Sequence, residues 1–259
     1  MEDVIVVTGP STLNGSVTVP RAKNSVLKLM AATLLAQGRS TITNVPNIQD
    51  VWIMAELLRR LGCAVDYDAD AAEVRIDVPA VPGHQADYDL VRAMRASISV
   101  LGPLVARRRR AEVALPGGDA IGSRGLDMHR SGLEAMGTSI SIDHGYLIAS
   151  VPDGLRGARH VLDFPAVGAT ENIMMAATLA RGTTVIDNAA REPEITDIAG
   201  MLCSMGAKIS GIGTNTLVIE GVEKLSPVTH RVVPDRIVAG TWAFAAAITG
   251  GSIEVRNAD

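Results

Sequence analysis

The stretch Met30–Val65, "MAATLLAQGRSTITNVPNIQDVWIMAELLRRLGCAV", decides the fold because the chain contains a second copy of it. Met175–Ile209 reads "MAATLARGTTVIDNAAREPEITDIAGMLCSMGAKI" and matches the first copy with one residue of slippage in the first helix. Each copy predicts an Ala-rich helix that ends at a glycine, a β-branched strand closed by an asparagine, a second helix that ends at another glycine, and a pair of strands. The glycines are Gly38, Gly62, Gly182 and Gly206, and the asparagines are Asn44 and Asn188. Internal repetition of this kind predicts a fold built from repeated helix-strand-helix-strand-strand units.

A third, more divergent copy lies between these two, over Ser97–Ile142. Its connection from strand to second helix is the glycine-rich stretch Leu115–His129, "LPGGDAIGSRGLDMH", where the other copies have an ordinary loop. A fourth unit begins at Gly240 and ends after its first strand and the asparagine Asn257. The sequence therefore predicts three complete units and one partial unit, whose apolar face needs a cover from another molecule or from a longer chain.

The composition favours a layered α/β protein, because 47% of the residues are hydrophobic and only 3% are aromatic. A net charge of −4 argues against binding to nucleic acid or to an anionic membrane. The nearly apolar segment Ile237–Ile248 is shorter than the roughly 18 residues needed to cross a bilayer, and the first residues lack the basic region of a signal peptide. We therefore expect a cytoplasmic protein, with Cys63 and Cys203 as buried thiols and no metal cluster.

Several basic side chains are candidates for binding an anion. Lys23 and Asn24 stand at the start of the first helix, where free N–H groups favour an anion, although a solvated helix start is the alternative. Arg95 lies in a small, apolar run and needs an anionic partner, which is either a ligand or a structural carboxylate. Arg124 offers a planar fork that suits phosphate or carboxylate. We interpret Arg107–Arg110 as a solvated helix end and His129 as a packed side chain.

Five blocks of sequence, in this order, resemble the UDP-N-acetylglucosamine 1-carboxyvinyltransferases, a family of enolpyruvyl transferases. They are "AKNSVLKLMAATLLA", "MRASISVLGPLVAR", "LPGGDAIGSRGLDMH", "VGATENIMMAATLARGTTVIDNAAREPEI" and "VVPDRIVAGTWAFAAA". The resemblance runs from near Val6 to the last residue, and the motifs of the related 3-phosphoshikimate enolpyruvyl transferase are not seen. It implies an inside-out α/β barrel with buried helices and outer sheets, in which residues 23–233 form a complete first domain. Residues 1–22 and 234–259 would belong to a partial second domain whose C-terminal part is missing.

The resemblance also implies an activity. The family transfers the enolpyruvyl group of phosphoenolpyruvate to the 3′-hydroxyl of UDP-N-acetylglucosamine and releases phosphate, at the start of peptidoglycan synthesis. These two substrates are the expected partners, and no cofactor is implied. An alternative is a catalytically incompetent fragment or sugar-nucleotide-binding partial copy that lacks the second half of the active site. A relative that acts on another hydroxyl acceptor is a third possibility.

The expected site residues follow from the same resemblance. Asp119 stands where most of the family has a cysteine, and we expect it to donate the proton to phosphoenolpyruvate, with Lys23 and Arg124 holding the anionic groups. The expected contacts to the UDP-sugar are Asn24, Arg95, Arg124, Gly125, Leu126, Asp127, Met128, Phe164, Pro165, Ala166, Val167 and Gly168. Gly125 replaces a proline of the family, while Phe164 and Ala166 replace polar residues.

A carboxyl group can donate a proton only when it is protonated. An aspartate with a pKa near ~3.9 is ionised at neutral pH, and nearby cations lower the pKa further. Our hypothesis is that closure over the anionic substrates desolvates Asp119 and offsets those cations, so that the pKa of its carboxyl group rises on binding. The loss of the thiol also predicts insensitivity to fosfomycin, which alkylates the family's cysteine.

Overall fold

The repeated sequence folds into repeated structure, which the computed structural model describes over residues 4–86, 88–115 and 125–258. The first unit consists of α1 (Lys23–Ala32) with the 3₁₀ turn η1 (Thr33–Leu35), β2 (Gly38–Thr43), α2 (Gln49–Arg60), β3 (Ala64–Asp68) and β4 (Glu73–Val78). The second consists of α3 (Tyr88–Ala93), η2 (Arg95–Val100), α4 (Leu101–Arg108), β6 (Arg110–Ala114), α5 (Asp127–Ala135), β7 (Ser139–Asp143) and β8 (Tyr146–Ser150). The third consists of α6 (Val167–Ala177), β10 (Thr183–Asp187), α7 (Pro193–Ser204), β11 (Lys208–Ser210) and β12 (Thr216–Glu220). The predicted order of elements in the units is therefore confirmed.

Each unit carries one four-stranded sheet, and all three sheets have the same topology. Their orders are β13-β2-β4-β3, β5-β6-β8-β7 and β9-β10-β12-β11. In each sheet the first strand runs parallel to its neighbour and the other pairings are antiparallel. The parallel edge strands are β5 (Gln85–Ala86), β9 (Arg159–Val161) and β13 (Thr229–Arg231).

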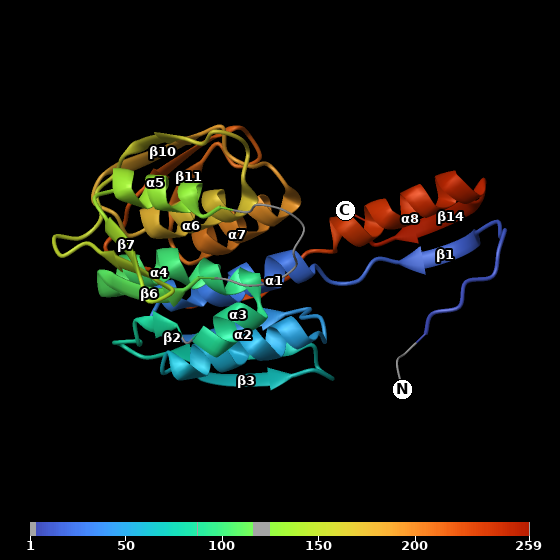
Figure 1. Cartoon of the computed structure of the whole chain (residues 1–259), viewed down its shortest axis with the longest axis horizontal. Helices are drawn as coiled ribbons and strands as arrows, with labels where there is room; N and C mark the ends of the chain where they lie inside the picture. The colour runs from blue at the N-terminus through green and yellow to red at the C-terminus, as the bar shows by residue number, and fades with distance from the viewer. Residues whose placement is uncertain (1–3, 87, 116–124, 259) are drawn as a thin grey trace.

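The edge strand β13 connects the end of the repeat to its beginning. It follows the third unit in the chain, yet it pairs with β2 of the first unit, with Thr229 opposite Thr41. In Figure 1 the sheets lie on the outside and α1, α4 and α6 lie between them. The described residues of the three units form three separate four-stranded sheets, and their hydrogen bonds do not close these sheets into the barrel that the resemblance implied.

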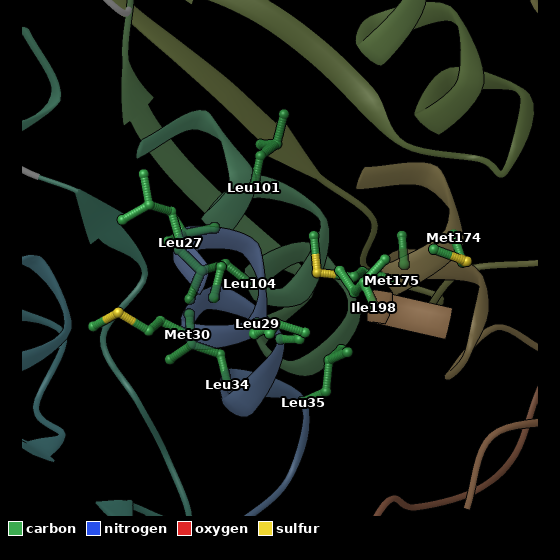
Figure 2. Packing of buried hydrophobic residues seen from close by; sticks show 14 of the residues in the cluster. Leu27, Leu29, Met30, Leu34, Leu35, Leu101, Leu104, Met174, Met175 and Ile198 are labelled. Atoms are coloured by element: carbon green, nitrogen blue, oxygen red, sulfur yellow. The ribbon is translucent and has the colours of Figure 1, made fainter. Parts of the chain in front are cut away.

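The inner helices are buried because they are apolar on nearly every side. Seven residues of α1 and nine of α6 are buried, which is the pattern of a helix surrounded by protein. Figure 2 shows labelled side chains of α1, α4, α6 and α7 meeting in one cluster, among them Leu29, Leu104, Met175 and Ile198. Aliphatic side chains, methionine and alanine make up nearly all of the buried cluster, and Tyr67 is its aromatic member among the described residues.

Glycine and asparagine residues end the repeated elements. Gly62, Gly137 and Gly206 follow α2, α5 and α7 with φ of 90°, 96° and 108°. After each, the next amide donates back to the helix, as in Cys63 N to Leu58 O at 3.0 Å, which satisfies a free carbonyl of the last turn. Asn44, Asn188 and Asn257 share a left-handed φ of 59°, 56° and 57° at the ends of β2, β10 and β14. Gly38 and Gly182 differ from their prediction, because the helical segments already end at Leu35 and Ala177. Gly38 begins β2, and Gly182 directly precedes β10.

Two further expectations about side chains need correction. Arg107 is not simply solvated at a helix end, because its guanidinium donates to Leu34 O and Ala80 O, both at 3.0 Å. It thus supplies a donor to the carbonyls at the end of η1. Cys63 is buried, and burial raises its pKa to about 12. Cys203 is only half-buried, because it lies at the edge of the α7 face that meets the core.

The fourth unit lies to one side of the other three in Figure 1. It consists of α8 (Arg236–Thr249) and β14 (Ser252–Arg256), and β14 pairs in parallel with β1 (Asn14–Thr18). The last described strand is thus paired with the N-terminal strand. None of the residues of α8 is buried, and Phe244 and Ile248 are 79% and 88% exposed. Across the described part of the chain, no helix has the length and apolar character that a membrane crossing requires.

The glycine after α7 provides a test of the repeat's helix ends. Gly206→Ala should lower the free energy of unfolding by about 1–2 kcal/mol, because an L side chain strains the positive φ. Gly200, inside the same helix and with no neighbouring atom within 4 Å of the point where a Cβ would lie, is the matched control, and Gly200→Ala should raise stability by about 0.5–1 kcal/mol. Urea unfolding of both variants measures the difference. Equal effects of the same sign would contradict the assigned helix end.

Candidate functional site

The first turn of α1 presents the cation predicted from the sequence. Lys23 is the first residue of the helix, and its ammonium lies 2.8 Å from Asp50 Oδ2 in the first turn of α2. Its side chain is 54% exposed, so the charge is accessible to a ligand. Asn24 is half-buried, and its carbonyl oxygen accepts a hydrogen bond from Lys28 Nζ at 2.6 Å.

Three helices that carry predicted site residues begin at an N-cap residue whose own side chain supplies no cap. The N-cap residues of α1, α5 and α6 are Ala22, Leu126 and Ala166, and none of them makes a capping hydrogen bond through its side chain. The first N–H groups of a helix carry a partial positive charge and bind anions such as phosphate. The arrangement therefore offers donors to a ligand with several anionic groups.

His129 joins the starts of α5 and α6. Its Nδ1 lies 2.9 Å from Asn172 Nδ2 of α6, so it accepts a hydrogen bond from that amide. A Cβ added to Gly168 would lie 3.2 Å from His129 Cε1, which places the first turn of α6 directly against the imidazole. Burial and then the charge of Arg95 lower the pKa of His129 to about 4. The side chain is thus neutral and packed, as predicted, and it gathers Arg95 and the first turns of both helices into one region.

Asn172 extends this contact to the second unit. Its Oδ1 accepts a hydrogen bond from Gly102 N at 2.8 Å, and its Nδ2 also lies 3.2 Å from Ile98 O. A buried amide whose donors and acceptor are used in this way fixes the separation of the elements that it joins. The residue therefore holds α6 in register with η2 and α4.

A buried ion pair joins α1 to α6 one turn further into the protein. Lys28 Nζ lies 3.5 Å from Glu171 Oε2, and the two side chains are 13% and 1% exposed. Neither carboxylate oxygen has a hydrogen-bond partner within the described structure. Burial raises the pKa of Glu171 to about 7, against the attraction of Lys28 and with a contribution from Glu194 and Glu192. Desolvation therefore outweighs the ion pair at this position.

A second polar contact fixes the first turn of α1 from the opposite side. Ser25 Oγ donates to Asp197 Oδ2 of α7, and His230 Nε2 of β13 lies 2.7 Å from Asp197 Oδ1. Ser25 and Asp197 are both buried. This contact connects the first helix to the third unit and to the strand that returns to the first sheet.

The structure brings most of the predicted residues to the starts of helices. Arg95 is half-buried at the start of η2, Leu126–Met128 enter α5, and Ala166–Gly168 enter α6. Phe164 is 59% exposed and shows an aromatic face to solvent. A Cβ at Gly125 would lie 2.5 Å from Asp127 Oδ2, so a proline there would require the Asp127 side chain to move. Asp119 and Arg124 lie outside the described residues.

Sequence reasoning did not find the acidic partners at this site. Glu171 carried a usable signal, because it is a lone carboxylate within the apolar run of α6. No sequence pattern predicted Asp50 or Asp197, because their partners are distant in sequence and are brought close only by packing. Among residues 4–86, 88–115 and 125–258, no three His, Cys, Asp or Glu side chains are grouped to hold a metal ion.

Comparisons with known proteins identify the class of protein to which this fold belongs. The enolpyruvyl transferase NikO from Streptomyces tendae superposes with a TM-score of 0.78 at 24% identity, covering 90% of this chain and 55% of that one. EPSP synthase from Acinetobacter baumannii superposes with a TM-score of 0.70 at 20% identity, covering 95% and 56%. The fold is therefore the α/β fold of enolpyruvyl transferases.

The sequence pattern of the EPSP synthase (3-phosphoshikimate 1-carboxyvinyltransferase) family matches residues 7–259, and the chain belongs to this family. The chain is 59% identical over 259 residues to the UDP-N-acetylglucosamine 1-carboxyvinyltransferase of Corynebacterium jeikeium (strain K411), and 59% identical to that of Nocardia farcinica (strain IFM 10152). The matches cover 100% and 98% of this chain and 61% of each relative. The resemblance seen in the five sequence blocks is thus confirmed, and the chain spans about three fifths of the length of these relatives.

The buried carboxyl group of Glu171 predicts a pH dependence of stability. Its pKa is about 7 in the folded state and 4.5 in the reference state, so the folded protein binds this proton more tightly than the unfolded chain. The contribution of Glu171 to the free energy of unfolding is therefore fully present below pH 4.5 and is lost as the pH rises through about 7. Glu171→Gln should remove the part of the fall in the free energy of unfolding with rising pH that Glu171 causes.

Urea unfolding at about pH 5 and about pH 8 measures the effect. Glu220→Gln, whose parent side chain is 63% exposed, is the matched control and should retain the decline of the original protein. An unchanged decline in Glu171→Gln would show that this carboxyl group does not titrate in that range.

Proposed function

We propose that this chain carries the part of an active site that binds UDP-N-acetylglucosamine and phosphoenolpyruvate for transfer of the enolpyruvyl group to the sugar's 3′-hydroxyl. The observation that carries the proposal is 59% identity, along all 259 residues, to a UDP-N-acetylglucosamine 1-carboxyvinyltransferase. We assign residues 23–233 to a complete first domain. Residues 1–22 and 234–259 belong to the beginning of a second domain, and the cytoplasm is the proposed compartment.

The site's electrostatics support ligands of this kind. Both substrates are anionic, and one carries a diphosphate. The exposed ammonium of Lys23 and the starts of α5 and α6, whose N-cap residues supply no side-chain cap, offer positive charge and N–H donors. We propose that Asn24, Arg95 and the two helix starts at Leu126–Met128 and Phe164–Gly168 contact the sugar nucleotide.

The reaction requires three proton movements. Carbon 3 of phosphoenolpyruvate gains a proton while the sugar hydroxyl loses its proton and its oxygen bonds to carbon 2. A proton is then lost from carbon 3 as the bond between carbon 2 and the phosphate oxygen breaks and phosphate leaves. We propose Asp119 as the donor of the first proton. Lys23 and Arg124 stabilise the anionic groups of phosphoenolpyruvate during the addition. The neutral state of His129 and its contact with Asn172 suit a structural role for that residue.

A second candidate function is a sugar-nucleotide-binding protein without transferase activity. The observation that favours it is the kind of group that the described site offers: the Lys23 ammonium and the starts of α5 and α6 suit the binding of an anionic ligand and need no proton transfer.

One pair of measurements separates the two candidates. The purified chain is mixed with both substrates, phosphate release is followed, and binding of UDP-N-acetylglucosamine is measured by calorimetry. Phosphate release that requires both substrates supports the transferase. Binding without release supports the second candidate, and the absence of binding contradicts both.

Asp119→Asn tests the proposed proton donor. The amide cannot donate the proton, so phosphate release should fall by at least about 100-fold, the lower end of a general acid's contribution. Binding of UDP-N-acetylglucosamine should stay unchanged, as calorimetry would report. Normal turnover by the asparagine variant would remove Asp119 from the mechanism.

Fosfomycin provides an independent test of the same position. The original chain has a carboxylate at residue 119, and burial raises the pKa of Cys63 to about 12, which suppresses its reactive thiolate. Incubation with fosfomycin and UDP-N-acetylglucosamine should therefore give no adduct in an intact-mass measurement. Asp119→Cys is the positive control and should gain one adduct. Alkylation of the original chain would contradict the expected insensitivity.

A further inference from the structure

Both connections between the three-unit body and the fourth unit pass through one short pair of segments. The chain leaves toward α1 through Pro20–Ala22 and returns toward α8 through Val233–Asp235. Ala22 N donates to Val233 O at 2.9 Å, and Asp235 N donates to Pro20 O at 2.8 Å. Because the two segments are hydrogen-bonded to each other, a change in one of them is transmitted to the other.

The side chain of Asp235 lies at this junction and serves two helices. Its Oδ1 accepts hydrogen bonds from Ile237 N at 2.9 Å and Val238 N at 3.2 Å, which caps α8. Its Oδ2 accepts a hydrogen bond from Lys23 N at 3.1 Å. The N-cap residue of α1 is Ala22, which has no acceptor of its own. One buried carboxylate, 8% exposed, therefore binds the first turns of α1 and α8 together.

We propose that Asp235 is a positioning residue for the ligand site: it fixes the first turn of α1, and with it the Lys23 ammonium, relative to α8. This role rests on the proposed function, since it assumes that Lys23 holds an anionic group of phosphoenolpyruvate. The two helix starts use different oxygens of this carboxylate, Oδ2 for α1 and Oδ1 for α8. Removing one acceptor frees one of the two starts while leaving the other capped.

A neighbouring ion pair supplies a matched control at the same junction. Arg236 Nε, in the first turn of α8, lies 2.8 Å from Glu194 Oε2 of α7, which is 4% exposed. This pair also links α8 to the body, but the hydrogen bonds and ion pairs described for it do not include the first turn of α1. A variant of Glu194 therefore loosens the junction without removing the acceptor of Lys23 N.

The experiment compares Asp235→Asn with Glu194→Gln in the whole chain. Asparagine is as good an N-cap as aspartate, but it has one acceptor oxygen and an NH₂ group that cannot accept. Amide hydrogen exchange should rise at Lys23, or at Ile237 and Val238, in Asp235→Asn, and at neither start in Glu194→Gln. Unchanged exchange at both starts in Asp235→Asn would overturn the shared cap.

Calorimetry with phosphoenolpyruvate, in the presence of saturating UDP-N-acetylglucosamine, tests the positioning role. Asp235→Asn should weaken binding by about 10-fold, since small displacements of a positioned group cost factors of this size or more, while Glu194→Gln should bind as the original chain does. If the original chain and Asp235→Asn bind equally, the positioning role is wrong and the proposed function stands. If the original chain does not bind phosphoenolpyruvate, the proposed function fails and the positioning role fails with it.

Discussion

The structure depends on the burial of α1, α4 and α6 against one another at the centre of three outer sheets. Helices that are apolar on nearly every side are stable in water only when other elements surround them. Three units are enough for this, because β13 returns from the third unit to the sheet of the first. The same requirement explains the exposed α8, which has its own apolar residues but no second helix or strand pair to cover them within the described part of the chain.

Burial of whole helices also determines where polar groups can act. The interior contains a few polar side chains, among them Ser25, Glu171, Asn172 and Asp197, and each of them contacts another helix. These contacts fix the inner helices along their axes, so the first turns of α1 and α6 keep a set position relative to α5 and η2. A ligand site built on helix starts needs this precision, because N–H groups act on an anion only over a short distance.

The repeat made the order of the elements predictable, since each copy carries the same glycine and asparagine signals. Gly62 and Gly206 end helices as expected, because a positive φ there suits glycine. The number of separate sheets and the hydrogen bonds of Arg107 to Leu34 O and Ala80 O were not predictable, since they depend on which segments meet after the chain turns back. At the site, Lys23 was predicted from its place before a helix and Arg95 from the small, apolar residues around it, whereas Asp197, His230 and Asp235 act through partners far away in the sequence.

We propose that the starts of α1, α5 and α6 together form the binding site for a sugar nucleotide. Two-dimensional NMR of the isotope-labelled chain during titration with UDP-N-acetylglucosamine would locate that site. We expect the backbone amides of Asn24, Met128 and Gly168 to shift together with one dissociation constant, while those of the outer strands β3 and β11 do not move. Shifts confined to the outer sheets, or none at saturating ligand, would contradict it.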